Sequence, residues 1–259
     1  MTMDLDQSSA TSKKLSFSTD QGTAARARIG LLVLESDQTM ETEFRALTDM
    51  DGVSVYHSRL ACDVSVTPET LAKMETEIPK AAKLLPDYLN LASIGYGCTS
   101  ASTIIGEDRV AGIIDAVHPG VPSTNPLTAA KAALTALGVN RLGLLTPYRP
   151  DVTIAMQREF DAAGIEVGFV GSFYEESDFV VGRIDEASIL KGVLEVGQND
   201  GIDGVFIACT SLRAARVVGE AERILQKPVT ASNHALAWHL LRLAGIDDQR
   251  TDCGRLYKL

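Results

Sequence analysis

The chain has 259 residues, of which 45% are hydrophobic and 22% are charged, and it carries a formal net charge of −10. Such a composition is typical of a globular protein with one large domain or two small ones. An acidic chain without clustered Lys and Arg is a poor ligand for nucleic acids and anionic membranes, so we expect neither as a partner. The longest apolar runs, such as 29–34, are too short to span a bilayer, and the N-terminus lacks a signal-peptide pattern, which predicts a cytoplasmic protein.

Residues 1–27 are rich in Ser, Thr, Asp, Gln and Lys and lack apolar periodicity, which predicts a flexible N-terminal extension. From residue 28 onward, short β-branched or Leu-rich runs alternate with amphipathic segments, the pattern of parallel βαβ units. We expect six strands, each followed by a helix, at 29–34, 53–58, 91–96, 142–145, 166–170 and 205–208. The fold class is therefore α/β.

Four landmarks of the first half recur in the second half in the same order. The matched pairs are Arg28-Ile-Gly-Leu-Leu-Val with Arg141-Leu-Gly-Leu-Leu-Thr, Gly52-Val-Ser-Val-Tyr with Gly164-Ile-Glu-Val-Gly, Gly95-Tyr-Gly-Cys98-Thr-Ser with Phe206-Ile-Ala-Cys209-Thr-Ser, and Val121-Pro-Ser-Thr-Asn125 with Thr230-Ala-Ser-Asn233. The opening arginine and the cysteine are separated by 70 residues (98 − 28) in one half and by 68 (209 − 141) in the other. The repeat predicts two pseudo-symmetric lobes, 28–122, completed by a C-terminal helix at about 231–250, and 123–230.

Cys98 and Cys209 each follow an apolar strand, and we expect each Cys-Thr-Ser motif to begin a helix. A thiol at a helix N-terminus lies near unpaired backbone N–H groups and a positive dipole end, which lowers its pKa and favours the thiolate. Ligands of open α/β sheets bind beyond the carboxyl ends of the strands, where both cysteines fall. Two thiols on opposite sides of one ligand can remove a proton from one face of a carbon and return one to the other. A lone buried cysteine is more simply a packing residue, but the matched pair favours catalysis.

The other candidate ligands for a metal do not form a pattern. Cys62 and Cys253 lack a Cys-Thr-Ser context and are interpreted as structural or incidental. His234 and His239 are five residues apart on one expected helix, which is poor spacing for a shared metal and favours core packing. We therefore assign no metal, and we expect all four cysteines to be free thiols.

At these residues the sequence resembles the aspartate/glutamate racemase superfamily, in the branch that contains maleate isomerase and arylmalonate decarboxylase. The resemblance covers about 28–246 and rests on Gly97-Cys98-Thr-Ser-Ala-Ser, Thr146-Pro-Tyr148, Val181-Gly-Arg-Ile184, Ala208-Cys209-Thr-Ser, and Ser232-Asn233 before Trp238-His-Leu-Leu-Arg-Leu-Ala-Gly245. It implies two Rossmann-like lobes with parallel sheets, an active site in the cleft between them, no cofactor, a small-molecule carboxylate substrate and a homo-oligomer, either a dimer or a tetramer.

The resemblance also implies roles for single residues. Tyr148 matches a tyrosine that hydrogen-bonds substrate in maleate isomerases, although tyrosines also cap strand ends for structural reasons. Thr99 and Thr210 lie where carboxylate-binding hydroxyls are expected, and Ser100 and Ser211 follow them in the same motifs. Backbone N–H groups after each cysteine are expected to bind the substrate carboxylate.

Two acidic residues depart from the pattern of maleate isomerases. Where those enzymes read Ser-Ser-Asn-Thr-Thr after the first strand, this chain reads Glu35-Ser-Asp37-Gln-Thr39, and Asp178 stands where they carry an Asn before Gly-Arg. An Asn donates a hydrogen bond to a carboxylate, whereas an ionised Asp repels it. The exchange favours a substrate that pairs one carboxylate with a positive charge. The structural alternatives are an N-cap of the helix at 39–47 for Asp37, and a cap or a surface charge for Asp178.

We therefore expect an isomerase, a racemase or epimerase that acts at the carbon alpha to a carboxylate of a small amino-acid-like or cyclic amidine acid. The pattern is similar to the ectoine-utilisation members of the branch, which act on ectoine or hydroxyectoine. Maleate cis–trans isomerisation by thiolate addition is an alternative against which Asp37 argues. Arylmalonate-type decarboxylation is disfavoured because those enzymes keep only the second cysteine, and a small-acid binding protein needs neither thiol.

Overall fold

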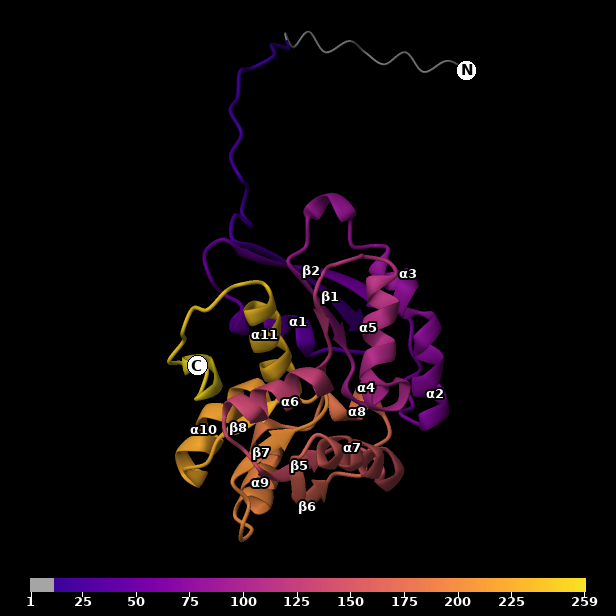
Figure 1. Ribbon diagram of the computed structural model, residues 1–259, viewed down its shortest axis with the longest axis vertical. Coiled ribbons are helices and arrows are strands. Elements are labelled where there is room, and N and C mark those ends of the chain that lie inside the picture. The colour runs from indigo at the N-terminus through magenta and orange to yellow at the C-terminus, as the bar shows by residue number, and fades with distance from the viewer. Residues whose placement is uncertain (1–11) are drawn as a thin grey trace, which may run out of the picture.

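The computed structural model describes residues 12–259. The part of the expected extension at 1–11 lies outside the described residues. Residues 12–26 contain no helix or strand; the exposed stretch 12–23 extends away from the body of the molecule (Figure 1), whereas Ala24 is buried. The first strand begins at Ala27, one residue before the expected start of the folded region.

The first half of the chain forms a four-stranded parallel sheet with the strand order β2-β1-β3-β4. Its strands are β1 (Ala27–Leu34), β2 (Val53–Leu60), β3 (Ser93–Gly97) and β4 (Ser123–Thr124). Its helices are α1 (Met40–Leu47), α2 (Pro68–Lys73), α3 (Ile78–Ala82), α4 (Thr99–Ile105) and α5 (Glu107–Asp115), with short 3-10 turns at Met74–Thr76 and Asp87–Leu89.

The second half forms a second parallel sheet with the corresponding order, β6-β5-β7-β8. Its strands are β5 (Arg141–Thr146), β6 (Glu166–Ser172), β7 (Gly204–Ile207) and β8 (Val229–Ala231). The helices are α6 (Pro126–Ala136), α7 (Pro150–Ala162), α8 (Asp178–Val181), α9 (Glu186–Gly197), α10 (Ala215–Leu225) and α11 (Ser232–Leu243), and a 3-10 turn at Leu256–Lys258 ends the chain. The internal repeat is thus a repeat of sheet topology.

The central strand β1 is buried on both faces because helices cover both sides of a parallel sheet. Successive side chains of a strand point to opposite faces, so its apolar residues divide between two clusters. Ile29, Leu31 and Val33 pack with side chains of α1 and α11. Leu32 and Leu34 join the larger cluster, which contains side chains of α2 to α5.

The expected α/β class and all six expected strands are confirmed. The pattern misses β4 and β8, which have two and three residues and are too short to show a period. Because β4 pairs with β3, the first sheet runs past the expected lobe boundary at residue 122. The helix expected at about 231–250 is α11, which packs against α1 and β3 of the first half.

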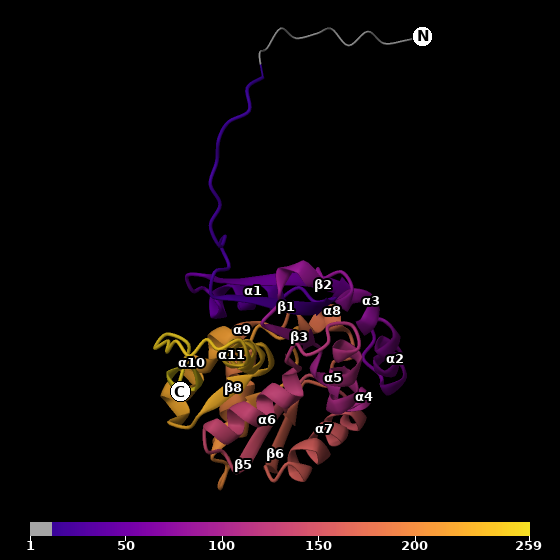
Figure 2. The same ribbon diagram turned by 45° about the horizontal axis from the view of Figure 1, so that its top comes forward.

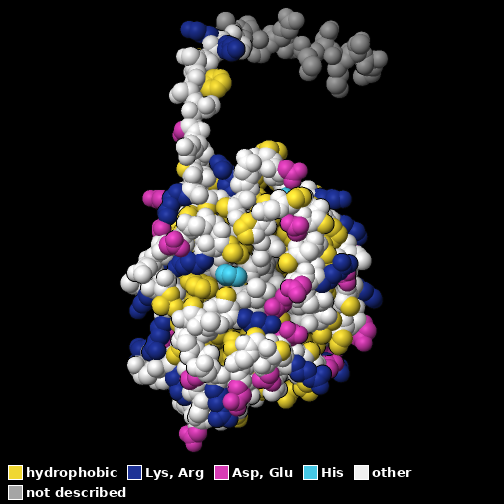
Figure 3. Space-filling view, viewed as in Figure 1, with side chains coloured by type: hydrophobic (Ala, Val, Ile, Leu, Met, Phe, Trp, Pro, Cys, Tyr) yellow, Lys and Arg dark blue, Asp and Glu magenta, His cyan; other side chains and the backbone are white. Residues whose placement is uncertain are grey.

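The two sheets lie one above the other, with β1 and β2 at one end of the molecule and β5 and β6 at the opposite end (Figures 1 and 2). Between them the halves meet through a short antiparallel bridge of Ser65 with Ser177. On the face shown in Figure 3, acidic and basic side chains are interspersed. Among the described residues, no helix is both long and apolar enough to cross a membrane.

Candidate active site

Both cysteines of the repeat open onto one cavity between the two halves. Residues after β3 and β7 line it together with side chains from the facing loops: Cys98, Thr99, Ser100, Tyr148, Asp178, Cys209 and Thr210. Residues 63, 65 and 66 of the segment 63–66 also line the cavity, and the Val64 carbonyl of this segment accepts a 3.1 Å hydrogen bond from the Asp178 N–H. The cavity volume is about 20 Å³, room for about one water molecule. The cavity is therefore too small for a substrate in this closed form, and a ligand can bind only if lining residues move.

Cys98 lies where the sequence predicts, between the end of β3 and the first turn of α4. It is the N-cap of α4, and its Sγ accepts a 3.4 Å hydrogen bond from the Ala101 N–H. The glycine before it, Gly97, allows the end of β3 to pack closely against α1 and β1, because a Cβ there would lie 2.6 Å from the sulfur of Met40 and 2.8 Å from the Leu32 carbonyl oxygen.

Cys209 differs from this expectation, since α10 does not begin until Ala215. Cys209 has φ +102°, a left-handed conformation that costs a non-glycine residue energy. The carbonyls of Thr210 and Ser211 accept side-chain hydrogen bonds from Asn233 and Thr39, both at 2.8 Å, in place of helical N–H groups. The expected helix start after the second cysteine is therefore wrong, and long-range polar contacts hold the loop.

A hydrogen-bonded chain joins the two Cys-Thr-Ser motifs. The Cys209 N–H donates to Ser232 Oγ at 3.0 Å, and this hydroxyl lies 2.8 Å from Thr99 Oγ1. The Thr210 hydroxyl donates to the Gly97 carbonyl at 3.3 Å. Each motif thus helps to position the other.

The pKa values of the thiols contradict the expected lowering. Burial raises the pKa of Cys98 to about 12, although the Ser100 hydroxyl and the Ala101 N–H act in the opposite direction. Burial also raises the pKa of Cys209, and the nearby Asp178 carboxylate raises it further. Desolvation outweighs the helix terminus in this closed cavity, so both side chains are thiols at neutral pH.

Asp178 lies in the cavity, and the alternatives of a surface charge and of a helix cap do not hold. It is buried, and the helix α8 that it begins has no side-chain cap. Its Oδ2 accepts a 2.5 Å hydrogen bond from Ser36 Oγ. In the described part of the chain, no Lys, Arg or His forms an ion pair with it. A buried carboxylate therefore faces both thiols.

Asp37 lies behind the cavity rather than in its lining. Its Oδ1 accepts hydrogen bonds from the N–H groups of Thr39 and Met40, at 2.7 and 2.8 Å, so it stabilises the start of α1 as in the structural alternative, although the N-cap residue itself is Thr39. Its Oδ2 is buried without a partner. Burial raises the pKa of Asp37 to about 6 against the lowering effect of these N–H groups.

The remaining expected residues divide between the lining and the layer behind it. Tyr148 lines the cavity, and its hydroxyl acts to lower the pKa of the Cys209 thiol. Burial raises the pKa of Tyr148 well above its ordinary value, so the phenol is a neutral donor. Ser211 does not line the cavity: its backbone N–H acts to lower the pKa of the Cys209 thiol, while its Oγ is buried without a partner.

The sequence analysis missed two polar residues near the thiols. Ser36, in the stretch that departs from the maleate isomerase pattern, contacts Asp178 and lies 3.3 Å from the Cys62 sulfur. Cys62, interpreted as incidental, is thus one contact away from the lining. Glu43 on α1 binds the loop that follows Cys209 through Asn233. A single Glu on a surface-type helix gives no signal for such a role.

His234 is a core residue, as expected. Its two ring nitrogens lie 2.9 Å from Thr230 Oγ1 and 2.7 Å from the Cys253 carbonyl. Burial lowers its pKa to about 4, so the ring is neutral. Across residues 12–259, no group of three or more His, Cys, Asp or Glu side chains is arranged to hold a metal ion.

Two repeated parallel sheets with a cysteine from each half facing a shared cavity define the class, a two-lobed α/β enzyme with paired thiols. The sequence comparisons identify its family. The model of the arylmalonate decarboxylase family matches residues 52–257, and the chain belongs to this family. A maleate isomerase of Alcaligenes faecalis is 24% identical over 243 residues, covering 88% of this chain and 95% of that protein. An arylmalonate decarboxylase of Bordetella bronchiseptica is 29% identical over 198 residues, covering 74% and 82%.

A solved structure has the same fold. It is a variant of the maleate cis–trans isomerase of Nocardia farcinica with a covalently bound succinylcysteine intermediate, and it matches with a TM-score of 0.79 at 23% identity over 90% of this chain and 98% of that one. The family relation places the chain among the cysteine-based isomerases and decarboxylases.

Proposed function

We propose that the protein is a two-cysteine isomerase. It removes and returns the proton on the carbon alpha to the carboxylate of a small acid that also carries a positive charge. The observation that carries this proposal is the presence of Cys98, Cys209 and the Asp178 carboxylate in one buried cavity. An amino acid or a cyclic amidine acid of the ectoine type has the required pair of charges.

The substrate carboxylate can be held by the polar groups beside the thiols. Ser100 from one half and Tyr148, a neutral phenol, from the other line the cavity, as do Thr99 and Thr210, whose hydroxyls contact Ser232 and the Gly97 carbonyl and would have to turn to bind a carboxylate. These donors come from both halves, so a bound carboxylate would lie between the cysteines. Such hydrogen bonds to a charged group are stronger than those between neutral groups.

The positive charge of the substrate suits Asp178. Bringing a second anion next to a buried carboxylate is costly, whereas a cation beside it is favoured. A cation has a further effect, because the Asp178 charge is one of the causes that raise the pKa of both thiols. A substrate that offsets this charge favours formation of the thiolate, and a dicarboxylate opposes it.

The proton transfers then balance. When substrate binds, one of the two thiols loses its proton to solvent. The resulting thiolate takes the proton from the alpha carbon and becomes a thiol again, and the electron pair left on carbon is delocalised into the carboxylate. The thiol of the other cysteine donates a proton to the opposite face of that carbon and becomes the thiolate. The reverse reaction begins from this second state, so the cysteines exchange roles with direction.

Two other reactions of the family are disfavoured by particular residues. Cis–trans isomerisation of maleate requires a dianion to bind beside Asp178. Decarboxylation of the arylmalonate type needs one protonating cysteine, whereas here both thiols line the cavity. These reactions remain distinguishable by their products.

The test is proton exchange in heavy water. Ectoine, hydroxyectoine, small amino acids, maleate and phenylmalonate are incubated with the protein, and NMR follows deuterium at the alpha carbon, fumarate formation or loss of carbon dioxide. We expect deuterium in a zwitterionic acid, abolished in Cys98→Ala and in Cys209→Ala and retained in the control Cys253→Ala. Binding of these acids without exchange by the native protein contradicts the proposal.

A further inference from the structure

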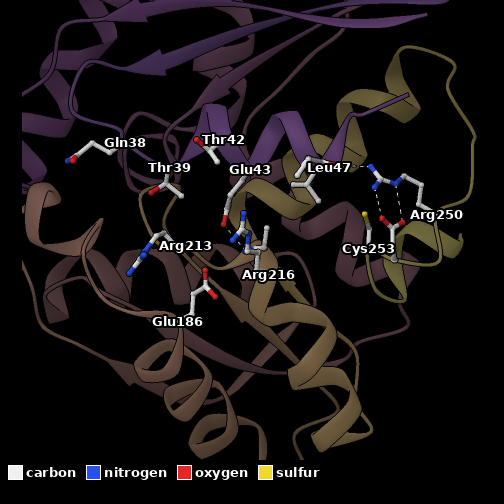
Figure 4. A pocket seen from close by; sticks show the side chains of 13 residues that line it. Gln38, Thr39, Thr42, Glu43, Leu47, Glu186, Arg213, Arg216, Arg250 and Cys253 are labelled. Atoms are coloured by element: carbon white, nitrogen blue, oxygen red, sulfur yellow. Dashed lines mark hydrogen bonds and ion pairs between the residues drawn. The ribbon is translucent and has the colours of Figure 1, made fainter. Parts of the chain in front are cut away.

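Glu43 is a buried carboxylate that bridges the two halves behind the Cys209 loop. It belongs to α1 of the first half and is only 8% exposed. Its Oε1 accepts a 2.9 Å hydrogen bond from the Ala215 N–H at the start of α10, and its Oε2 accepts a 2.8 Å hydrogen bond from Asn233 Nδ2 at the start of α11. Figure 4 shows Glu43 directed from α1 toward Arg216 in the first turn of α10.

Asn233 passes this contact on to the loop. The same Nδ2 donates to the Thr210 carbonyl at 2.8 Å, while Asn233 Oδ1 is buried without a partner. The two hydrogens of one amide group are therefore divided between Glu43 and the residue after Cys209. Because a carboxylate only accepts, Glu43 fixes which end of the amide faces the loop.

The loop after β7 contains the strained backbone of the site. Cys209 keeps its φ of +102° only while the surrounding contacts maintain it. The hydrogen bond from Asn233 to the Thr210 carbonyl is one of those contacts.

Several charged groups around Glu43 influence its ionisation. Those that lie near it or share its pocket come from the loop before α1, from the start of α9, from the segment before and within α10, and from the C-terminal segment: Asp37, Glu186, Arg213, Arg216, Arg250 and Asp252. Burial raises the pKa of Glu43 to about 7, with smaller raising effects from Asp37 and Glu186. Its charge therefore changes near neutral pH.

We propose that Glu43 is a positioning residue for Cys209: its ionised carboxylate orients the Asn233 amide, and this amide holds the loop that presents the Cys209 thiol to the cavity. The inference rests on the proposed function of Cys209. A protonated Glu43 has an O–H to donate, and the unpartnered Asn233 Oδ1 is a ready acceptor. The amide then turns over, and an oxygen replaces the donor opposite the Thr210 carbonyl.

Glu43→Gln imitates the protonated form at every pH. The Gln oxygen can accept from the Ala215 N–H, but its NH₂ group then faces the Asn233 NH₂ group, and turning the amide over removes the bond to Thr210. We expect kcat to fall by about tenfold, the size that the loss of one buried hydrogen bond implies, with KM unchanged. Asn233→Ala removes the same bond directly and should reproduce the effect, and the double variant should be no slower than either single one.

A second readout does not need turnover. Iodoacetamide alkylation of Cys209 is measured relative to Cys98 by peptide mass spectrometry over pH 5–9, so that the shared closed cavity affects both thiols. In the native protein the ratio should rise as pH falls through about 7, because the loop is released. In Glu43→Gln the ratio should be high at all pH values. Glu186→Gln, which removes a carboxylate from the same pocket, should keep the pH-dependent ratio, with its midpoint slightly lower because Glu186 helps to raise the pKa of Glu43.

The outcomes separate the two proposals. If the native protein turns over no candidate acid, the proposed function fails, while the alkylation ratio still tests Glu43. Glu43→Gln with native kcat and a native, pH-dependent alkylation ratio overturns the positioning role. The positioning role is also overturned if Glu43→Gln lowers the melting temperature but leaves the alkylation ratio unchanged, because Glu43 would then be a purely structural contact. If Glu43→Gln does not fold, Asn233→Ala decides by the same ratio.

Discussion

The hydroxyl of Ser36 lies 2.5 Å from a carboxylate oxygen of Asp178, although 142 residues separate them in the chain. The contact crosses between the two halves at the cavity, and it holds Asp178, which lines the cavity with both thiols and with a second acidic residue, Asp63. The pKa values of both thiols depend on the Asp178 carboxylate, and under the proposed function the choice of substrate does as well.

Asp178→Asn should therefore change two properties together. Without the negative charge, the pKa of the Cys209 thiol should fall, because Asp178 is the second-largest cause that raises it, after burial. A dicarboxylate such as maleate should bind more tightly and a zwitterionic acid more weakly. Calorimetric titration with both kinds of acid and the pH dependence of Cys209 alkylation check these expectations. Weaker binding of the dicarboxylate would remove Asp178 from the substrate site.

Asp37→Asn should act on stability rather than on substrate choice, since Asp37 lies behind the lining. Its pKa rises from 3.8 to about 6 on folding, so the folded state is penalised once the group ionises. The penalty is absent below the unfolded pKa of about 4, grows as pH rises to about 6, and reaches about 3 kcal/mol. The side-chain oxygen of Asn can still accept the hydrogen bonds from the N–H groups at the start of α1.

Urea unfolding at pH 4 and pH 7 measures this effect. The native protein should lose more stability over this interval than Asp37→Asn, in which the fall that Asp37 causes is absent. Asp37→Ala, which loses these hydrogen bonds as well, should be about 1 kcal/mol less stable than Asp37→Asn at both pH values. Equal pH dependence in the native protein and in Asp37→Asn would show that Asp37 does not titrate in this range.

The extent to which sequence predicts this site follows from the range of the interactions involved. The positions of Cys98 and Cys209 on one cavity follow from the repeat, because equivalent loops of repeated lobes face one another. The left-handed Cys209 is not visible in the motif, since contacts from Thr39 and Asn233 stabilise it, and neither is close in sequence. The raised thiol pKa values come from closure of the cavity, which no local pattern encodes.

The left-handed backbone at Cys209 predicts an unusual response to glycine. Cys209→Gly should be more stable than Cys209→Ala by about 1 kcal/mol, because glycine adopts a left-handed φ without strain. Thermal unfolding of the two variants checks the comparison. A Cys209→Gly variant that is less stable than Cys209→Ala would contradict the assigned conformation of Cys209.

The bridge between Ser65 and Ser177 beside the cavity offers a way to test whether the cavity must open. Directly opposed residues of an antiparallel pair have Cα atoms about 4.5–5.5 Å apart, within the range that a disulfide spans. The double variant Ser65→Cys, Ser177→Cys should therefore crosslink on mild oxidation and keep the segment 63–66 in its closed position. Since the closed cavity holds about one water molecule, the oxidised protein should neither bind nor turn over substrate, and dithiothreitol should restore both.

The Ser65→Cys single variant, treated in the same way, controls for oxidation of Cys98 and Cys209. Full activity in the crosslinked protein would show that substrate enters by a route that leaves this bridge intact.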